Sequence, residues 1–367
     1  NTAIGKDALT ENTTGTQNVA VGANALDANT TASFNTAIGY NALTSNTTGS
    51  TNTAVGDQAA QGVTEAGRIT AIGHYAGQAI TTGNDNVCVG AASLDATTTG
   101  TNNVAVGTFS LGNNTTASNN TAIGHASLEA NTTGTENTAL GGNALDSNTT
   151  ASENTALGYI ALTTNTTGAT NTAVGAQALR YNTTASNNTA IGYQSLKENT
   201  TGHSNVAVGS TALDANTTGS ENTAVGQTCL GKCTTGNYNT AIGRNALAQG
   251  TDFVRNTAVG YQALASTTAS DSTAVGYESL LNNTTGTYNT AVGTFAGGNN
   301  TTGNDNTSVG VNALYNTTTG SSNTAVGRDA LENNTTASSN TAVGNQALTA
   351  NTTGAGNAAL GSFALSQ

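Results

Sequence analysis

The side chains best suited to chemistry in this sequence are three cysteines. Cys229 and Cys233 lie four positions apart in the segment C-L-G-K-C, a spacing that would let a disulfide close across a turn, as in extracellular proteins. The other interpretation is that both are unpaired and fill small spaces. Cys88 stands where most repeats have Ala and is either a small buried residue or one that meets its copies in other chains. Three cysteines supply too few ligands for a structural zinc site.

Histidines and carboxylates offer no catalytic arrangement. His74, His125 and His203 lie far apart along the chain and are interpreted as solvent-exposed turn residues. Carboxylates such as Asp252 and Glu278 share no place in the sequence pattern that would bring them together for general acid–base work. We therefore expect a protein that is not an enzyme and that holds no metal and no cofactor.

A set of tyrosines is the one candidate for ligand contact. These tyrosines occupy the same place in a repeat that is described below: Tyr40, Tyr159, Tyr193, Tyr261 and Tyr277. A strip of tyrosines would stack on sugar rings, which makes a glycan a candidate partner. The alternative is that they are ordinary exposed aromatic residues of a turn. The N-T-T triplets match the N-glycosylation acceptor, but Asn and Thr also have a structural role in turns.

The composition excludes several classes of protein. Pro, Met and Trp are absent, and only 8% of the residues are charged and 4% aromatic, so the large core side chains of a conventional globule are missing. The net charge of −12 argues against nucleic acid as a partner, and no apolar run is long enough to insert into a membrane. A low-complexity sequence with a strict period indicates a repeat architecture.

The repeat begins with N-T-A-V/I-G at Asn1 and returns at Asn18, Asn35 and onward with a period of seventeen, apart from one step that is shorter by one, from Asn256 to Ser272. We therefore expect residues 1–367 to form a single repeat domain of twenty-one complete coils and one partial coil, with no separate domains. The chain opens on Asn1 in mid-pattern, so we expect it to be a segment of a longer protein. The position numbers used below count from the residue that begins each repeat.

Position 5 of every repeat is Gly. Because this residue follows a short β-prone run, we interpret it as a sharp corner that needs a positive φ angle or a close approach of another chain segment. These structural corner glycines begin with Gly5, Gly22, Gly39, Gly56, Gly73, Gly90 and Gly107.

The alternation of residue types predicts which side chains share a face. Position 2 is mostly Thr or Val, position 4 is always aliphatic, and position 9 is nearly always Leu. We expect these three side chains to fill the interior of each coil. Positions 3 and 8 are small, mostly Ala, and we expect this face to meet another chain at close range. The alternative is that Ala fits tight packing inside a single-chain coil. Two short strands and two turns per coil would make an all-β, parallel β-solenoid, or β-roll.

Two further features concern the stacking of coils. Position 1 is Asn in nearly every repeat, and stacked coils would align these amides into a hydrogen-bonded ladder. The stretch from Asp57 to Asp85 departs from the pattern, since Leu is missing twice at position 9 and the N-T-T turn is replaced. This stretch is interpreted as a local irregularity, with a functional patch as the alternative.

The repeat resembles sequences of known fibrous proteins. The segments N-V-A-V-G at Asn18–Gly22 and Asn205–Gly209 resemble the S-V-A-I-G motif of the heads of YadA-like trimeric autotransporter adhesins. The segment N-T-A-V-G-Y-Q-A-L at Asn256–Leu264 is similar to repeats of phage-type tail-fibre proteins. The resemblance implies a left-handed, homotrimeric β-roll at a cell or virion surface. In those adhesins the repeat is mostly shorter than the period found here.

These features together predict a structural or adhesive extracellular fibre segment, a rigid rod that presents a binding tip or assembles into a filament. The expected partner is the chain itself, as a homotrimer or end to end, with a cell-surface glycan or protein receptor as a further partner. Nucleic acid and membrane insertion are not expected. The alternative is an ice-binding β-solenoid that uses its regular Thr columns.

Overall fold

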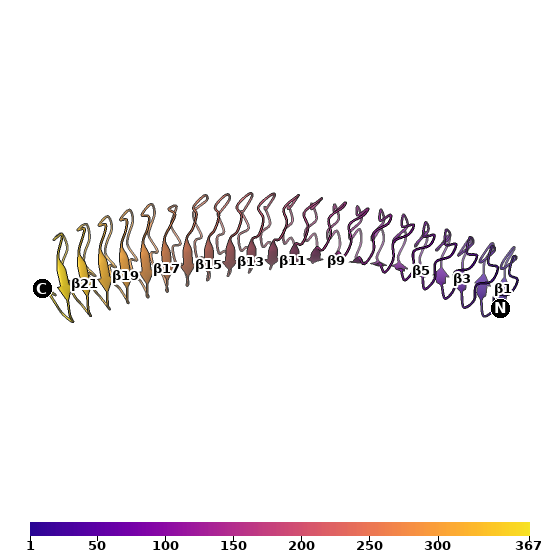
Figure 1. The fold of residues 1–367 in the computed structure, drawn as a ribbon, viewed down its shortest axis with the longest axis horizontal. Helices are drawn as coiled ribbons and strands as arrows, with labels where there is room; N and C mark the ends of the chain where they lie inside the picture. The colour runs from indigo at the N-terminus through magenta and orange to yellow at the C-terminus, as the bar shows by residue number, and fades with distance from the viewer. The chain divides into compact units, whose positions relative to one another are not determined.

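The computed structural model describes residues 1–367 and divides into two compact units, Asn1–Ser186 and Asn187–Gln367. In each unit the chain winds into stacked coils, and every coil contributes one short strand and no helix (Figure 1). The all-β, parallel β-solenoid with one coil per sequence repeat is therefore confirmed.

The strands of the first unit all begin at position 2 of a repeat and end at position 4: β1 (Thr2–Ile4), β2 (Val19–Val21), β3 (Thr36–Ile38), β4 (Thr53–Val55), β5 (Thr70–Ile72), β6 (Val87–Val89), β7 (Val104–Val106), β8 (Thr121–Ile123), β9 (Thr138–Leu140), β10 (Thr155–Leu157) and β11 (Thr172–Val174). Those of the second unit follow the same rule: β12 (Thr189–Ile191), β13 (Val206–Val208), β14 (Thr223–Val225), β15 (Thr240–Ile242), β16 (Thr257–Val259), β17 (Thr273–Val275), β18 (Thr290–Val292), β19 (Thr307–Val309), β20 (Thr324–Val326), β21 (Thr341–Val343) and β22 (Ala358–Leu360).

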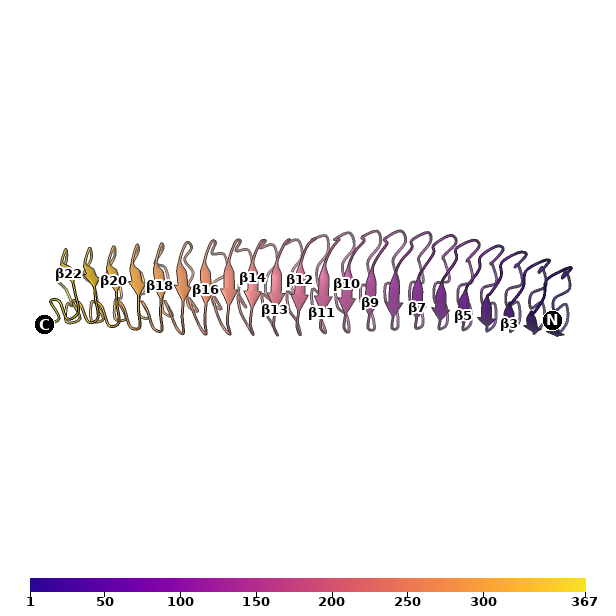
Figure 2. The same cartoon turned by 60° about the horizontal axis from the view of Figure 1, so that its bottom comes forward.

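Neighbouring strands within a unit pair in parallel, with each residue opposite its equivalent one repeat away. In the first unit Ala3 pairs with Ala20, and in the second Ala207 pairs with Ala224. Equal positions therefore form continuous columns of identical or similar side chains, and the strands line one side of each unit (Figure 2). A feature of one coil thus becomes a continuous stripe along the unit.

The predicted second strand of each coil is absent, and positions 6 to 11 form turns instead. The cause is a backbone that repeatedly enters the left-handed region: in the first coil Asp7, Leu9 and Gln17 have φ angles of 54°, 56° and 57°. A bulky residue such as Leu adopts this conformation only where its surroundings fix it. Here the N–H group of Leu9 donates to the carbonyl of Ala25 on the next coil at 3.0 Å, and the Leu side chains of the inner coils, such as Leu26, are fully buried.

The predicted corner at position 5 is confirmed. Gly141 has a φ angle of +135°, and a Cβ atom added to it would lie 2.5 Å from the carbonyl oxygen of Gly158, its equivalent on the next coil. The N–H group of Gly158 in turn donates to the carbonyl of Leu140 at 2.8 Å, which draws the two corners together. Glycine is therefore required both by the backbone angle and by the close stacking of coils.

The predicted assignment of the two strand faces is wrong. The Ala residues of positions 3 and 8, such as Ala20 and Ala25, are fully buried inside the coil beside Leu26. The flanking Val19 and Val21 point outward and are only half-buried. So short a coil encloses little volume, and two buried Asn side chains occupy part of it. The small Ala side chains and one Leu supply the remaining core, and the larger β-branched residues lie outside.

Two columns of buried Asn side chains tie the coils together, and the predicted ladder at position 1 is confirmed. The Oδ1 atom of Asn120 accepts a hydrogen bond from the backbone N–H group of Asn137 at 2.9 Å. The Nδ2 group of Asn120 donates to the backbone carbonyl of Gly134, also at 2.9 Å. A second column at position 12 runs in one direction, since the Nδ2 group of each Asn donates to the Oδ1 atom of the preceding coil, as from Asn131 to Asn114 at 3.0 Å. Fully buried amides with satisfied partners fix the register of stacking.

The position-12 ladder is interrupted where another residue replaces Asn. Asn300 donates to Asn283 at 2.7 Å, but the next coil has Thr317, which donates its hydroxyl to the carbonyl of Asn334 instead. The Oδ1 atom of Asn300 is consequently buried without a hydrogen-bond partner. A buried acceptor left unpaired costs on the order of 1–3 kcal/mol.

We expect the substitution Thr317→Asn to stabilise the protein by about 1 kcal/mol, because the new amide would donate to Asn300 and accept from Asn334. Asn and Thr have nearly the same volume, and a void of about 10 Å³ lined by Asn300, Thr317 and Gly297 leaves room for the longer reach of the amide. The measurement is the free energy of unfolding in urea, with Thr319→Asn at an exposed turn position as the control. A variant at position 317 that unfolds at the same or a lower urea concentration than the control would contradict the ladder.

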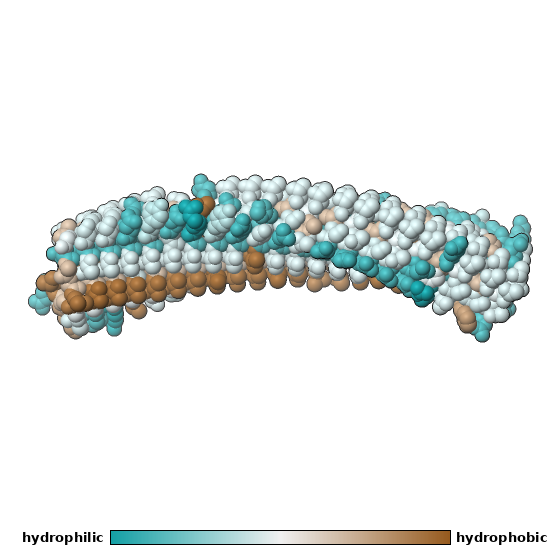
Figure 3. Space-filling model, viewed as in Figure 1, coloured by the Kyte–Doolittle hydropathy of each residue, from teal (hydrophilic) through white to brown (hydrophobic).

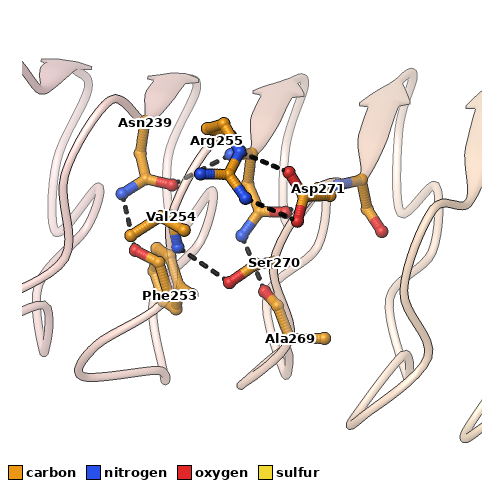
Figure 4. A network of polar contacts seen from close by, with 9 residues as sticks. Asn239, Phe253, Val254, Arg255, Ala269, Ser270 and Asp271 are labelled. Carbon is orange, nitrogen blue, oxygen red and sulfur yellow. Dashed lines mark hydrogen bonds and ion pairs between the residues drawn. The ribbon is translucent and has the colours of Figure 1, made fainter.

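The coil that begins at Asn256 is one residue shorter than its neighbours, and the deletion falls in the N-T-T turn. Strand pairing is unchanged, with Thr257 opposite Thr273, and the Nδ2 group of Asn256 still donates to the carbonyl of Ala269 at 2.7 Å. Figure 4 shows the flank of this coil, where Arg255 and Asp271 form a two-pronged ion pair with bonds of 2.6 and 3.0 Å. A second ion pair of the same kind joins Arg68 to Asp85 on adjacent coils of the first unit.

The irregular stretch from Asp57 to Asp85 keeps the same strand and turn pattern as its neighbours. Gly77 stands where other coils have Leu, and the space is occupied by Ile80 and Cys88, whose atoms lie 3.0 and 3.1 Å from the position of a Cβ atom on Gly77. Both are fully buried. The substitutions therefore compensate one another within the core, and the interpretation as a local irregularity accounts for them.

Candidate functional site

A continuous surface of each unit is the outward side of its strands, which is formed by positions 2 and 4 of every repeat. It is called here the outer strand face. Position 2 is Thr or Val except for Ala358, and position 4 is Val, Ile or Leu throughout, so this face contains no charged side chain. The alternation of the β-strand sends these two residues outward whenever the Ala between them points into the coil.

The outer strand face exposes apolar side chains at regular intervals. In the first unit Ile38 and Leu140 are 40% and 43% exposed, and in the second Ile242 and Val292 are both 40% exposed. Figure 3 shows the result over the second unit, where a continuous brown band of apolar residues lies along the side on which Figure 1 draws the strands. A pale band runs beside it in the same view.

An uncharged surface of this kind is suited to contact with another ordered surface. Soluble monomers seldom expose contiguous apolar patches beyond a few hundred Å², and larger ones mark sites of interaction. Parallel sheets are in general covered on both faces. The inner face of this sheet is covered by buried turn residues of the coil, such as Ser127 and Leu128, whereas nothing in the single chain covers the outer face.

The tyrosines proposed as a glycan strip fall into two groups. Tyr261 and Tyr277 lie on adjacent coils with their rings stacked at a centroid distance of 5.3 Å. Tyr40, Tyr159 and Tyr193 are 53%, 61% and 51% exposed and have no such ring partner. The structure therefore brings together only one pair of the five.

The stacked pair is part of a longer aromatic run that the sequence pattern does not reveal. Phe295 packs edge to face against Tyr277 at 5.4 Å, and Tyr315 packs against Phe295 at 5.9 Å. These rings come from positions 6, 7 and 10 of successive repeats, so no single column of the sequence contains them. They become neighbours because position 7 of a coil bonds to position 6 of the preceding coil, as in the donation from the N–H group of Phe295 to the carbonyl of Tyr277 at 2.9 Å.

The three cysteines are buried free thiols, so the proposed disulfide between Cys229 and Cys233 is not formed in this structure. The thiol of Cys229 donates to the carbonyl of Ala241 at 3.0 Å, and that of Cys233 lies 3.9 Å from the carbonyl of Gly236. Burial raises the pKa of Cys229 to about 12 and that of Cys233 to about 11, and it raises the pKa of Cys88 still further. They behave as small core residues.

We expect the native protein to show no reaction with 5,5′-dithiobis(2-nitrobenzoate) at pH 8, because a thiol reacts as its thiolate and these pKa values lie well above that pH. After unfolding in guanidinium chloride without reductant, all three thiols should react, which is measured by the absorbance of the released product. Reaction of only one thiol after unfolding would show that Cys229 and Cys233 are joined.

The remaining titratable residues do not gather into a site. His74 lies 3.5 Å from Asp57, and the ring of His125 packs against Phe109 at 6.2 Å. Burial and the nearby Asp146 raise the pKa of Glu129. No group of three or more His, Cys, Asp or Glu residues is placed to hold a metal ion.

No helix long and apolar enough to cross a membrane is present.

Comparison with known proteins gave no relative: no family model matches the chain, and no curated protein is detectably similar to it.

Proposed function

We propose that the chain is a structural segment of an extracellular fibre that associates with copies of itself through the outer strand face. The observation that supports this most directly is the uncharged pair of columns at positions 2 and 4, which continues over every strand of each unit. A partner with the same repeat would match these columns coil for coil, because its exposed residues recur at the same spacing.

In the proposed assembly three chains with left-handed coils associate, and their outer strand faces are turned toward a common axis. The resemblance of the N-V-A-V-G segments to trimeric adhesin heads favours this number. The packing also favours it, since so short a strand presents only its first and last side chains on this face and forms a narrow stripe. Three narrow stripes meeting at an axis would bury both columns of each chain.

Such an assembly would serve as a rigid shaft that holds a binding tip away from a cell or virion surface. The ladders of backbone and Asn hydrogen bonds make each coil dependent on its neighbours, so the shaft would resist local bending. An exposed surface on the shaft would remain free for contact with a surface receptor.

The experiment that tests the proposal is the solution mass by multi-angle light scattering over a series of protein concentrations. A constant mass of three chains is the expected result. A folded monomer at all concentrations would overturn the proposal, and a mass that grows with concentration would replace it with assembly into a filament.

A second candidate function is ice binding, which the same face favours for a different reason. In most coils position 2 is Thr and position 4 is aliphatic, so hydroxyl and methyl groups recur in straight columns on one face, as between Thr257 and Thr273. Thermal hysteresis of a folded monomer, in which the freezing point of the solution falls further than the melting point of ice, would support this function. The absence of thermal hysteresis at high protein concentration would exclude it.

A further inference from the structure

The aromatic run of the second unit leads into an open groove lined by amides. The groove has a volume of about 570 Å³ and is lined by Asn282, Asn299, Asn316 and Asn333, all at position 11, together with threonines of position 13. The two features adjoin, because the ring of Tyr315 lies against the backbone of Gly298, the residue before Asn299. Groove and aromatic run therefore form one surface, called here the aromatic–amide groove.

The amides of the groove are fixed in place and still have capacity to bond. The Nδ2 group of Asn282 donates to Asn299 at 3.0 Å, that of Asn299 to Asn316 at 3.3 Å, and that of Asn316 to Asn333 at 3.2 Å. Each inner amide thereby uses one of its two N–H groups and one acceptor site of its oxygen on its neighbours. The remaining N–H groups and acceptor sites can bond to hydroxyl groups of a ligand.

The threonines of the groove are ordered in the same way. The hydroxyl of Thr301 donates to the carbonyl of Thr318 at 2.9 Å, and that of Thr318 to the carbonyl of Thr335 at 3.1 Å. Because their hydrogens are used within the protein, these oxygens are presented as acceptors. The surface thus offers two parallel columns along the stack of coils, one of amides that can donate and accept and one of hydroxyl oxygens that can accept.

The chemistry of this surface selects a class of ligand. Aromatic rings stack on the apolar C–H faces of sugar rings, and ordered amides and hydroxyls bond to sugar hydroxyl groups. The repetition from coil to coil suits a ligand that is itself a repeating chain. No Lys or Arg lines the groove, and Glu278 lies beside Tyr277 and raises its pKa by accepting its hydroxyl, so an anionic chain would be repelled.

We infer that the aromatic–amide groove of the second unit binds a neutral polysaccharide along the stack of coils. Tyr261, Tyr277 and Phe295 supply the stacking surface, Tyr315 joins it to the groove, and Asn299 and Asn316 bond to the sugar hydroxyls. This inference does not depend on the proposed self-association, since positions 6 to 13 supply the groove and positions 2 and 4 supply the outer strand face.

The test is binding of cellohexaose, maltohexaose and chitohexaose to the full chain, followed by isothermal titration calorimetry and by tyrosine fluorescence, which is clean because the chain has no Trp. Polygalacturonate serves as the anionic comparison. We expect at least one neutral hexasaccharide to bind and polygalacturonate not to bind. Failure of all three neutral sugars to bind at millimolar concentration, or binding of polygalacturonate alone, would overturn the inference.

Two variants assign the binding to this surface. Tyr277→Ala should weaken binding about tenfold, because it removes the central ring of the run. Combined Asn299→Ala and Asn316→Ala substitutions should weaken it at least as much while the stacking surface remains. The control is Tyr40→Ala, which removes a tyrosine of the same repeat position that has no ring partner. Equal loss of affinity in the control and in Tyr277→Ala would overturn the assignment.

Discussion

Replacement of Gly141 by Ala should destabilise the first unit by about 3 kcal/mol or more. The φ angle of +135° is one that a residue with a Cβ atom rarely adopts, and the added atom would lie 2.5 Å from the carbonyl oxygen and 2.7 Å from the carbonyl carbon of Gly158. Both contacts are with backbone that is itself fixed by the next corner, so the strain cannot be relieved by a side-chain movement. The measurement is the free energy of unfolding in urea.

The neighbouring Gly142 provides a matched control for this prediction. A Cβ atom added to Gly142 would have its nearest contacts at 3.7 and 4.0 Å, both with the ring of Tyr159, which is ordinary van der Waals contact. Gly142→Ala should therefore leave stability unchanged or raise it by up to about 1 kcal/mol, because Ala restricts the unfolded chain. If both variants unfold at the same urea concentration, the corner does not require glycine.

The corner, the Asn ladder and the repeat itself could be predicted because they depend on features that one sequence displays many times. An invariant residue type at a fixed period indicates a shared backbone requirement, and Gly141 shows what that requirement is. The column of Asn at position 1 similarly needs only the assumption that coils stack in parallel, which the pairing of Ala3 with Ala20 confirms.

The inside and outside of the coil could not be assigned in this way. Both faces of the strand are apolar, so hydrophobic alternation does not distinguish them, and the larger residues were expected to fill the core. The outcome depends on the area that the coil encloses, which is set by the left-handed φ angles at Asp7, Leu9 and Gln17. No propensity predicts such an angle for Leu, and the turns it produces also replaced the expected second strand.

The aromatic–amide groove could not be predicted from the sequence for a similar reason. Its rings belong to different positions of the repeat, and only the hydrogen bonds between successive coils show that position 6 of one lies beside position 7 of the next. Tyr261 and Tyr277 share a column and can be paired from the sequence, whereas Phe295 and Tyr315 stand at other positions of the repeat and cannot.

Introduction of Glu on the outer strand face should abolish the association of chains without unfolding them. Ile242 and Val292 are each 40% exposed in the single chain, so Ile242→Glu and Val292→Glu place the new carboxylates in solvent while the protein is monomeric. In the proposed trimer the same carboxylates would be buried and close to their copies in the other chains. An uncompensated buried charge costs about 3–5 kcal/mol, which corresponds to a loss of affinity of at least about a hundredfold.

Light scattering should therefore report a monomer for the double variant, with the circular dichroism spectrum of the parent chain. The control is Thr285→Glu, which adds a carboxylate at an exposed turn position outside the strands and should leave the mass at three chains. The variant also carries a pH test. Burial favours the neutral carboxylic acid and would raise its pKa in the assembly, so association should return as the pH falls from 7 toward 4. A double variant that remains trimeric at pH 7 would show that the chains meet elsewhere than at the outer strand face.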